Sequence, residues 1–372
     1  MRMIGRVTRS RALMVLGLGA AVLLIAAAAS VAARPSSAPS LPPTSSDRLI
    51  ASTLRALARD PSVSGHLTAH LDFGLPSIPN EGPGAAASKA AGFLASLTGS
   101  HRLRLWSSAD GFRLADLLEA SERAVFVSRT DAWAWDFSSF TAYHLGRIPQ
   151  GHRGSAHEGD RPGIDFVDPL ALTRRALDAI KPSTRVAVTG TTRVAGRDAY
   201  VLRLEPRTPA TLVGRIEIAV DSERRVPLRV AVIPRGRRGA AISVAFTSIS
   251  FASIKRSVYS FTPPPGAKVR DVSRELGGKE GTEQGTRGSE REEYGPGDFP
   301  RLLGHDWTTV IALRTPPLAT LRGAGEGFDP AALLPLSGPL LSVRLVDRTD
   351  HGWLVYGLVP QSALVLAARE LP

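Results

Sequence analysis

The chain has 372 residues, of which 43% are hydrophobic and 22% charged, a composition that excludes a wholly disordered protein. It has no cysteine, which excludes disulfides, thiolate metal sites, a cysteine nucleophile and a lipid-modified cysteine. The net charge is +12, and without the four arginines of residues 1–33 it is 12 − 4 = +8, which favours anionic lipid headgroups or polymers as partners. Nucleic acid is not expected, because the basic residues are scattered along predicted strands without a basic helix or zinc-finger spacing.

The N-terminal segment predicts export. Arginines at positions 2, 6, 9 and 11 precede the uncharged residues 12–33, which as a helix would span about 33 Å. The arginine side is expected to stay cytoplasmic, which places the rest of the chain outside. Ser30-Val31-Ala32 also has the small-x-small pattern at which signal peptides are cleaved. Residues 1–33 are therefore either a signal anchor, giving a single-pass protein of the cell membrane, or a signal peptide of a secreted one.

A spacer and a helix follow this segment. Residues 34–46 are rich in proline and serine, and we expect them not to pack but to hold the next domain away from the membrane. A helix is predicted from near Asp47, because Ile50, Leu54 and Leu57 form one apolar stripe and Pro61 ends it.

The region from residue 64 onward alternates between apolar and polar residues with a period of two. This pattern predicts short strands separated by turns, and hence a large antiparallel sheet that is open or partly rolled. Within one such strand, Trp133, Trp135 and Phe137 share a face. The predicted strands are 66–73, 102–106, 111–115, 124–127, 132–137, 186–194, 199–204, 214–220, 227–233 and 241–251.

Two helices are predicted within this strand-rich region. Asp168-Pro169 forms an N-terminal cap for a helix that runs to about Ile180. The alanine-rich residues 84–97 form the other, which is either a lid over a cavity, a helix that docks on a surface, or a core helix.

Several motifs between residues 47 and 270 resemble the LolA-like superfamily of lipoprotein carriers, and in particular the actinobacterial LolA-like proteins and the N-terminal region of RseB and MucB. Their order and spacing carry the resemblance. They are Arg113-Leu114-Ala115-Asp116, the tryptophan-containing residues 131–136, the strand 190–206, the hairpin 216–228 and the ending 261–269.

The resemblance implies an α+β, strand-rich fold: a half-open barrel of curved antiparallel sheet, covered by helices, whose hydrophobic cavity holds acyl chains. A bent sheet independently needs apolar groups on its concave face, either as a lipid site or as ordinary core packing. The candidate lining residues are Leu103, Leu105, Trp133, Trp135, Phe137, Ile216, Ile218, Leu228, Val230, Val244 and Phe246.

The C-terminal part extends beyond this resemblance. Residues 271–300 are rich in glycine, glutamate and arginine and predict a flexible charged linker. Residues 301–372 predict a small α/β region that packs on the main domain 47–270. The elements expected in it are strands at 307–313, 340–347 and 352–359 and helices at 329–334 and 360–370.

The sequence contains no catalytic, metal or cofactor motif of a known kind. His66 and His70 share a strand face and are expected to be surface residues, as are His144, His152 and His157 in a predicted loop. Asp131 and Asp136 lie on opposite faces of their strand, so they do not form a glycosidase pair. We therefore expect no cofactor, no metal and no enzymatic activity.

Two functions remain open. The first is a membrane-anchored extracytoplasmic protein that binds an acyl lipid or a lipoprotein. The second is a sensor resembling RseB and MucB, which binds an anti-sigma-type membrane protein through residues 301–372.

Overall fold

The computed structural model describes residues 38–74, 98–118, 121–147, 182–271, 301–315, 317 and 334–372. The segment 12–33, the predicted helices 84–97 and 168–180 and nearly all of the linker and of the predicted helix 329–334 lie outside these residues. In the part of the chain that is described, no helix is long and apolar enough to cross a membrane.

The main structural element is a sheet of twelve strands. In chain order the strands are β1 (Val63–Leu71), β2 (Gly99–Ser108), β3 (Gly111–Leu117), β4 (Glu122–Ser128), β5 (Asp131–Asp136), β6 (Thr141–Arg147), β7 (Thr184–Val194), β8 (Arg197–Pro206), β9 (Val213–Asp221), β10 (Pro227–Pro234), β11 (Ile242–Ser250) and β12 (Lys268–Asp271). Their spatial order is β12-β6-β5-β4-β3-β2-β1-β11-β10-β9-β8-β7.

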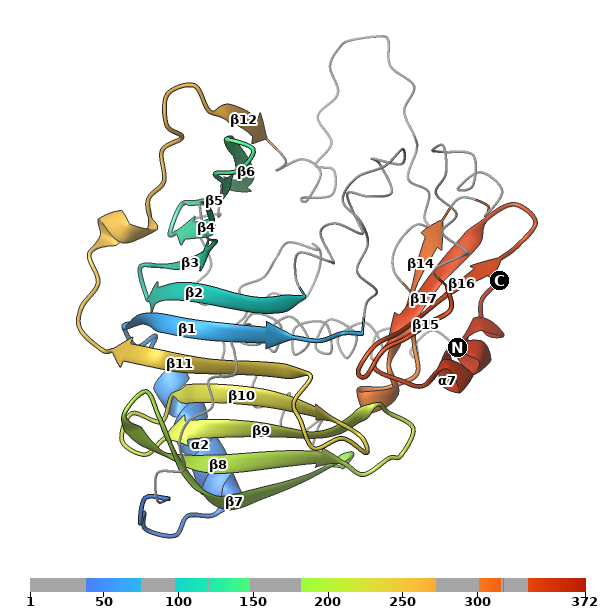
Figure 1. Ribbon diagram of the computed structural model, residues 1–372, viewed down its shortest axis with the longest axis horizontal. Helices are drawn as coiled ribbons and strands as arrows, with labels where there is room; N and C mark the ends of the chain where they lie inside the picture. The colour runs from blue at the N-terminus through green and yellow to red at the C-terminus, as the bar shows by residue number, and fades with distance from the viewer. Residues whose placement is uncertain are drawn as a thin grey trace, which may run out of the picture.

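The sheet is strongly curved but not closed, with β12 at one edge and β7 at the other (Figure 1). All neighbouring strands are antiparallel except β12 and β6, which are parallel. The predicted strand-rich fold with a large curved sheet is confirmed. Every strand predicted between residues 66 and 251 is present, whereas β6 falls in a segment predicted to be a loop.

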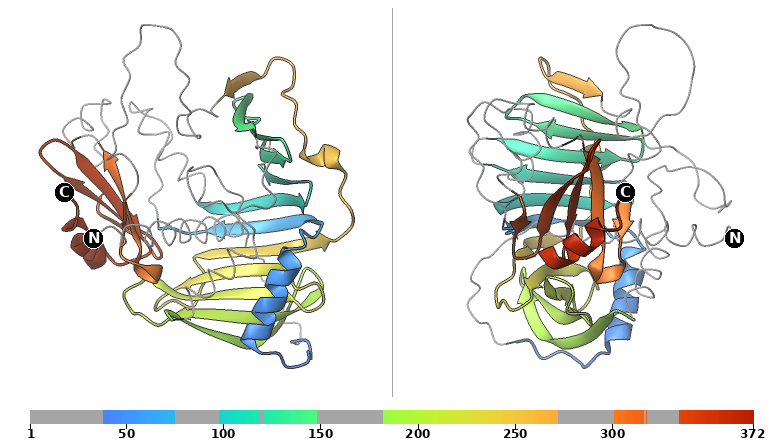
Figure 2. Two further views of the ribbon diagram at one scale, coloured as in Figure 1. Left: turned by 180° about the vertical axis from the view of Figure 1, so that it is seen from behind. Right: turned by 90° about the vertical axis from the view of Figure 1, so that its right-hand side faces the viewer.

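Helix α2 (Ser46–Leu57) packs on one end of this sheet (Figure 2). The Ser45 hydroxyl accepts a hydrogen bond from the Arg48 amide at 3.3 Å and caps the N-terminus of the helix. Leu49 and Ile50 are buried against apolar residues of β8 and β9. The predicted helix is therefore present.

The end of the proline-rich spacer also contacts the sheet, so the expectation that the spacer does not pack is wrong for its last residues. The Thr191 hydroxyl donates to the Pro39 carbonyl at 2.7 Å, and the Tyr200 hydroxyl donates to the Pro42 carbonyl at 2.8 Å. Leu41 packs beside the residues that α2 covers. A polyproline stretch exposes its carbonyl groups, and side-chain donors of β7 and β8 bind them.

The cross-strand register defines an inner face of the sheet. Residues paired across neighbouring strands point to the same face. One such row joins Ala69, Val244, Val230, Ile218 and Leu202 from β1 to β8. This face, on which α2 also packs, is called the inner face. It carries an apolar cluster of residues from β1, β2 and β8–β11.

The opposite, outer face is covered at β3–β6 by residues 252–267, which precede β12. A second row of paired residues runs along it through Trp106, Arg113, Phe126, Trp133 and His144. The covering segment passes outside the sheet (Figure 1) and contains the 3₁₀ helix η1 (Arg256–Tyr259). It contributes Phe261 and Ala267 to the apolar cluster under it.

The C-terminal residues form a second, smaller sheet. Its strands are β13 (Arg301–Leu303), β14 (Val310–Thr315), β15 (Leu336–Ser337), β16 (Ser342–Asp347) and β17 (Gly352–Gly357), in the order β13-β14-β17-β16-β15, followed by helix α7 (Gln361–Ala368). The predicted strand 307–313 begins later than expected, because Trp307 lies in the 3₁₀ helix η2 (Asp306–Thr308). The hairpin and the terminal helix are present as predicted.

The C-terminal unit contacts the end of the large sheet. The Trp307 indole donates to the Thr184 hydroxyl at 2.7 Å, and the Thr211 hydroxyl donates to the Leu358 carbonyl at 2.8 Å. Leu340, from the β15–β16 turn, is fully buried within the inner-face cluster. The C-terminal unit therefore supplies part of the apolar core of the main sheet.

Candidate functional site

Eight of the eleven predicted lining residues lie together in the inner-face cluster. Six of them are buried with at most 9% of their surface exposed, and two are half-buried against the others. The structure thus brings predicted residues of β2, β9, β10 and β11 together in one apolar cluster. Its members among the predicted residues are Leu103, Leu105, Ile216, Ile218, Leu228, Val230, Val244 and Phe246.

The two tryptophans of the predicted site lie elsewhere. The register pairs Leu105 with Leu114, Leu114 with Val125, and Val125 with Ala134, so Ala134 shares the inner face. Trp133 and Trp135, its neighbours along β5, therefore point to the outer face. There they pack against Phe261 of the covering segment, with ring centroids 5.8 and 5.6 Å away.

Phe137 is also separate from the inner-face cluster. It follows the last residue of β5, and 51% of its surface is exposed. Its ring makes edge-to-face contacts with Trp135 and Phe140, with centroids 6.5 and 6.3 Å apart. The three aromatic residues share a face, as the alternation predicted, but that face is not the one that carries the aliphatic residues.

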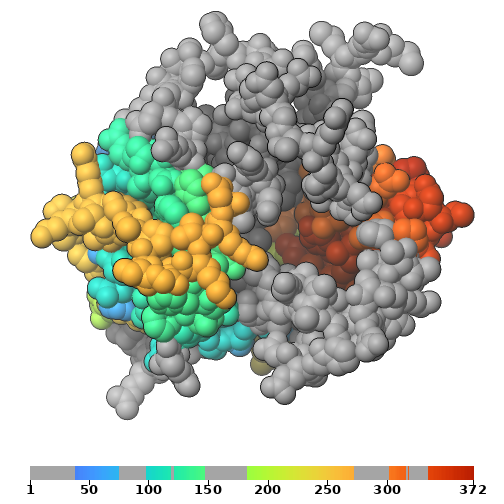
Figure 3. Space-filling model, turned by 90° about the horizontal axis from the view of Figure 1, so that it is seen from above, coloured from blue at the N-terminus to red at the C-terminus, as the bar shows by residue number. Residues whose placement is uncertain are grey.

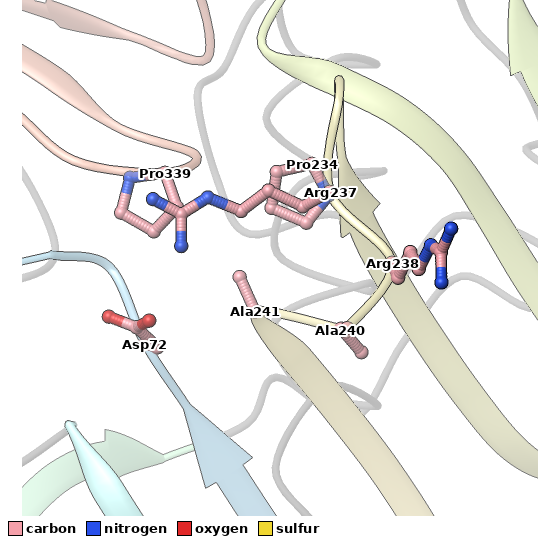
Figure 4. A pocket seen from close by; sticks show the side chains of 8 residues that line it. Asp72, Pro234, Arg237, Arg238, Ala240, Ala241 and Pro339 are labelled. Carbon is pink, nitrogen blue, oxygen red and sulfur yellow. The ribbon is translucent and has the colours of Figure 1, made fainter.

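An open hollow of about 370 Å³ lies where the C-terminal unit meets the sheet (Figure 4). It is formed by the β10–β11 turn, the residue after β1 and the β15–β16 turn. Arg237 extends across it toward Pro339, while Arg238 points away and Asp72 faces it from the other side (Figure 4). Ala241 lines the hollow and belongs to the inner-face cluster, so the hollow adjoins that apolar cluster.

A second hollow, of about 230 Å³, lies among the paired residues of β1, β2 and β11. Trp106, Arg104 and His66 line it together with serine hydroxyls of β1 and β11. The Arg104 guanidinium stacks on the Trp106 ring, 4.6 Å from its centroid. Neither hollow is lined by any of the eleven residues predicted for the lipid site.

His144 belongs to a polar cluster on the outer face, so the expectation of a solvated loop histidine is wrong. Its Nε2 lies 2.6 Å from Asp131 Oδ1, and its Nδ1 lies 3.3 Å from Asp271 Oδ2 of β12. The hydrogen bond to Asp131 raises the pKa of His144 against the opposing effect of burial, and Asp271 raises it further. Asp131 also accepts a hydrogen bond from the Trp133 indole at 2.9 Å.

The other described histidines predicted as surface residues form no metal site. His66 Nδ1 lies 3.2 Å from the Ser248 hydroxyl, whereas His70 Nδ1 lies 3.4 Å from the Ser100 hydroxyl. The two imidazoles thus bond to strands on opposite sides of β1. Within the described ranges, no group of three or more histidine and acidic residues could hold a metal ion. His152 and His157 lie outside these ranges.

Several residues of the inner-face cluster were not predicted as lining residues. The alternation of β1 indicated that its apolar residues share a face, but it gave no sign that this strand is the centre of the sheet. Leu340 had no signal at all, because it enters the cluster from a different sheet. The additional buried members include Leu67, Ala69, Leu71, Val232, Ile242 and Leu340.

Comparisons with known proteins give structural matches only. No family model and no curated protein sequence matches the chain. A solved complex of MucA and MucB from Pseudomonas aeruginosa is similar to it, with a TM-score of 0.44 and 14% identity over 87% of this chain and 96% of that chain. LppX from Mycobacterium tuberculosis has a TM-score of 0.30 and 11% identity over 56% of this chain and 98% of its own.

A LolA superfamily protein from Nitrosomonas europaea is also similar, with a TM-score of 0.22 and 8% identity over 59% of this chain and 99% of that chain. The solved structures similar to this chain thus include the LolA-like and MucB proteins that its motifs resemble.

Proposed function

We propose that this chain is a non-enzymatic, extracytoplasmic protein, attached to the membrane, that binds the acyl chains of a lipid or lipoprotein against the inner face of its sheet. The observation that carries the proposal is the inner-face cluster. It forms a continuous layer of mostly buried apolar side chains across β2, β1, β11, β10 and β9 of a sheet that is curved and not closed.

The physical basis is the burial of methylene groups. Each methylene moved from water to an apolar surface contributes about 0.8 kcal/mol, so a long acyl chain can be held without any polar catalytic group. The row from Ala69 to Leu202 runs across the strands, so an acyl chain lying along it would contact apolar side chains from β1 to β8. The basic N-terminal end and the apolar segment 12–33 support attachment to a membrane.

Native mass spectrometry with lipid extraction tests the proposal on the full chain, expressed with export. We expect acyl species to remain bound. Val230→Thr places a hydroxyl on the inner face at nearly constant volume and should reduce the bound lipid severalfold. Val355→Thr makes the same change in the fully buried core of the C-terminal unit and should not. A lipid-free protein, or equal lipid loss in both variants, would contradict the proposal.

A second candidate function is that of a sensor that binds an anti-sigma-type membrane protein through the C-terminal unit. The observation that favours it is the exposure of two leucines there, Leu358 by 41% and Leu366 by 59%. Under this alternative, Leu358→Ser with Leu366→Ser should abolish cross-linking to a membrane protein and leave the bound lipid unchanged. If this double variant kept both its cross-linking and its bound lipid, the alternative would be contradicted.

A further inference from the structure

Exposed apolar side chains gather at one end of the strands β3–β6 and β12. Among the described residues, seven large hydrophobic side chains are exposed, and four of them lie here. They are called the apolar rim and comprise Leu118 (36%), Phe137 (51%), Phe140 (37%) and Val269 (56%). Soluble surfaces seldom concentrate exposed apolar groups in this way unless they bind something apolar.

The topology explains why these residues meet. In an antiparallel sheet, the end of β3, the start of β4, the end of β5 and the start of β6 lie at the same end. Leu118 follows β3, while Phe137 and Phe140 enclose the β5–β6 turn. The Lys268 amide donates to the Phe140 carbonyl at 3.0 Å, which brings β12 to the same place. Viewed from above, β5, β6 and the segment before β12 are neighbours on the surface (Figure 3).

The phenylalanines are held at the tip of a tight turn. The Phe140 amide donates to the Phe137 carbonyl at 3.2 Å, and Phe140 has a φ of +48°. The Asp136 carboxylate accepts hydrogen bonds from the amide and the hydroxyl of Ser138. The two rings also contact each other and the Trp135 ring edge to face, so the turn holds them in place while both stay partly exposed. A surface that buries them therefore pays a low entropic cost.

Basic side chains flank the rim. Among the described residues near it, the acidic groups lie against basic partners: Glu122 is 3.0 Å from Arg113, Asp136 is 4.0 Å from Arg123, and Asp271 of β12 is 3.3 Å from His144. Two further basic residues of β12, Lys268 and Arg270, are exposed on the same strand as Val269. An apolar tip flanked by basic side chains is complementary to an anionic lipid surface.

We infer that the apolar rim docks on an anionic bilayer, with Phe137 and Phe140 inserted at the interface and Lys268 and Arg270 near the headgroups. Aromatic rings favour this interfacial depth, and lysine and arginine favour anionic headgroups. The inference goes beyond the proposed lipid site, because docking on a bilayer does not require an acyl chain on the inner face.

The absence of cysteine from the chain allows a direct test. Ser139→Cys places a single spin label between the two phenylalanines, and Ser362→Cys places one at an exposed position of α7 as a control. The full chain is added to vesicles of phosphatidylcholine with one quarter phosphatidylglycerol. The accessibility of each label to oxygen and to an aqueous nickel reagent is then compared with that in solution.

We expect the label at position 139 to gain oxygen access and lose nickel access, while the label at 362 stays aqueous. Phe137→Ser with Phe140→Ser should lower the docked fraction at least about tenfold, whereas Leu358→Ser with Leu366→Ser should not change it. Lys268→Gln with Arg270→Gln should weaken docking roughly fivefold for each charge removed, on anionic vesicles only.

A label at 139 that stays as aqueous as the one at 362 would overturn the inference, and so would equal docking on vesicles of pure phosphatidylcholine. Neither result depends on the lipid that native mass spectrometry detects within the protein. Failure of docking and failure of the proposed lipid site are therefore distinguishable.

Discussion

The placement of the β5 tryptophans on the outer face predicts the effect of Phe261→Ala. Phe261 lies in the covering segment and contacts three rings, those of Phe126, Trp133 and Trp135, with centroids 4.7, 5.8 and 5.6 Å away. Removing its ring should loosen the cover from β4 and β5. It should leave the inner-face cluster, on the other side of the sheet, unchanged.

The expected magnitude follows from burial and ring contacts. A fully buried phenylalanine replaced by alanine costs about 3–5 kcal/mol, and each aromatic pair contributes about 0.5–1.5 kcal/mol of such a total. Phe261 is only half-buried. We therefore expect Phe261→Ala to lower the free energy of unfolding of the protein by about 2–3 kcal/mol.

Urea unfolding followed by tryptophan fluorescence measures this change. Phe137→Ala is the matched control, because that ring is half exposed and should cost less than about 1 kcal/mol. Lipid bound to each variant is measured by extraction. If Phe261→Ala cost no more than Phe137→Ala, or if it removed the bound lipid, the assignment of the tryptophans to a structural outer layer would be refuted.

Two further predictions concern ionised groups. Asp221 is fully buried, and although burial alone would raise its pKa, hydrogen bonds from Arg197 and from the backbone lower it. Its contribution to stability is thus present above its unfolded pKa and is lost as the pH falls through the folded value. In urea unfolding, Asp221→Ala should therefore lower the free energy of unfolding by about 3–5 kcal/mol at pH 7 and by much less at pH 2. The pKa of His144, measured by NMR, should lie above 6.5 and should fall in the Asp131→Asn variant. Because this pKa is raised, the contribution of His144 to stability is present at low pH and is lost as the pH rises through the folded value. An unshifted His144, or a loss for Asp221→Ala that does not depend on pH, would contradict these assignments.

The strands were predictable because each carries its own signal. Alternation along a strand places neighbours on opposite faces, and it correctly grouped Leu103 with Leu105 and Trp133 with Trp135. It does not say which face of one strand continues which face of the next. That depends on register, and in this sheet bulges between His66 and Leu67 and between Ala132 and Trp133 shift the register.

Other features depend on contacts between distant parts of the chain. β6 has a glycine and a histidine in its alternating pattern, and it is a strand because β5 and β12 pair with it. His144 acquires its two carboxylate partners only through that pairing. Leu340 reaches the inner-face cluster from another sheet. Local patterns contain none of this information, because tertiary pairing decides it.

The central claim is that an acyl chain lies along the inner face. Methyl NMR spectra of the full chain with a nitroxide-labelled stearic acid test it most directly. We predict broadening of the methyl signals of Val230 and Val244, with those of Val355 and Val359 in the C-terminal core unaffected. Broadening absent from Val230 and Val244, or equal in both groups, would contradict the claim.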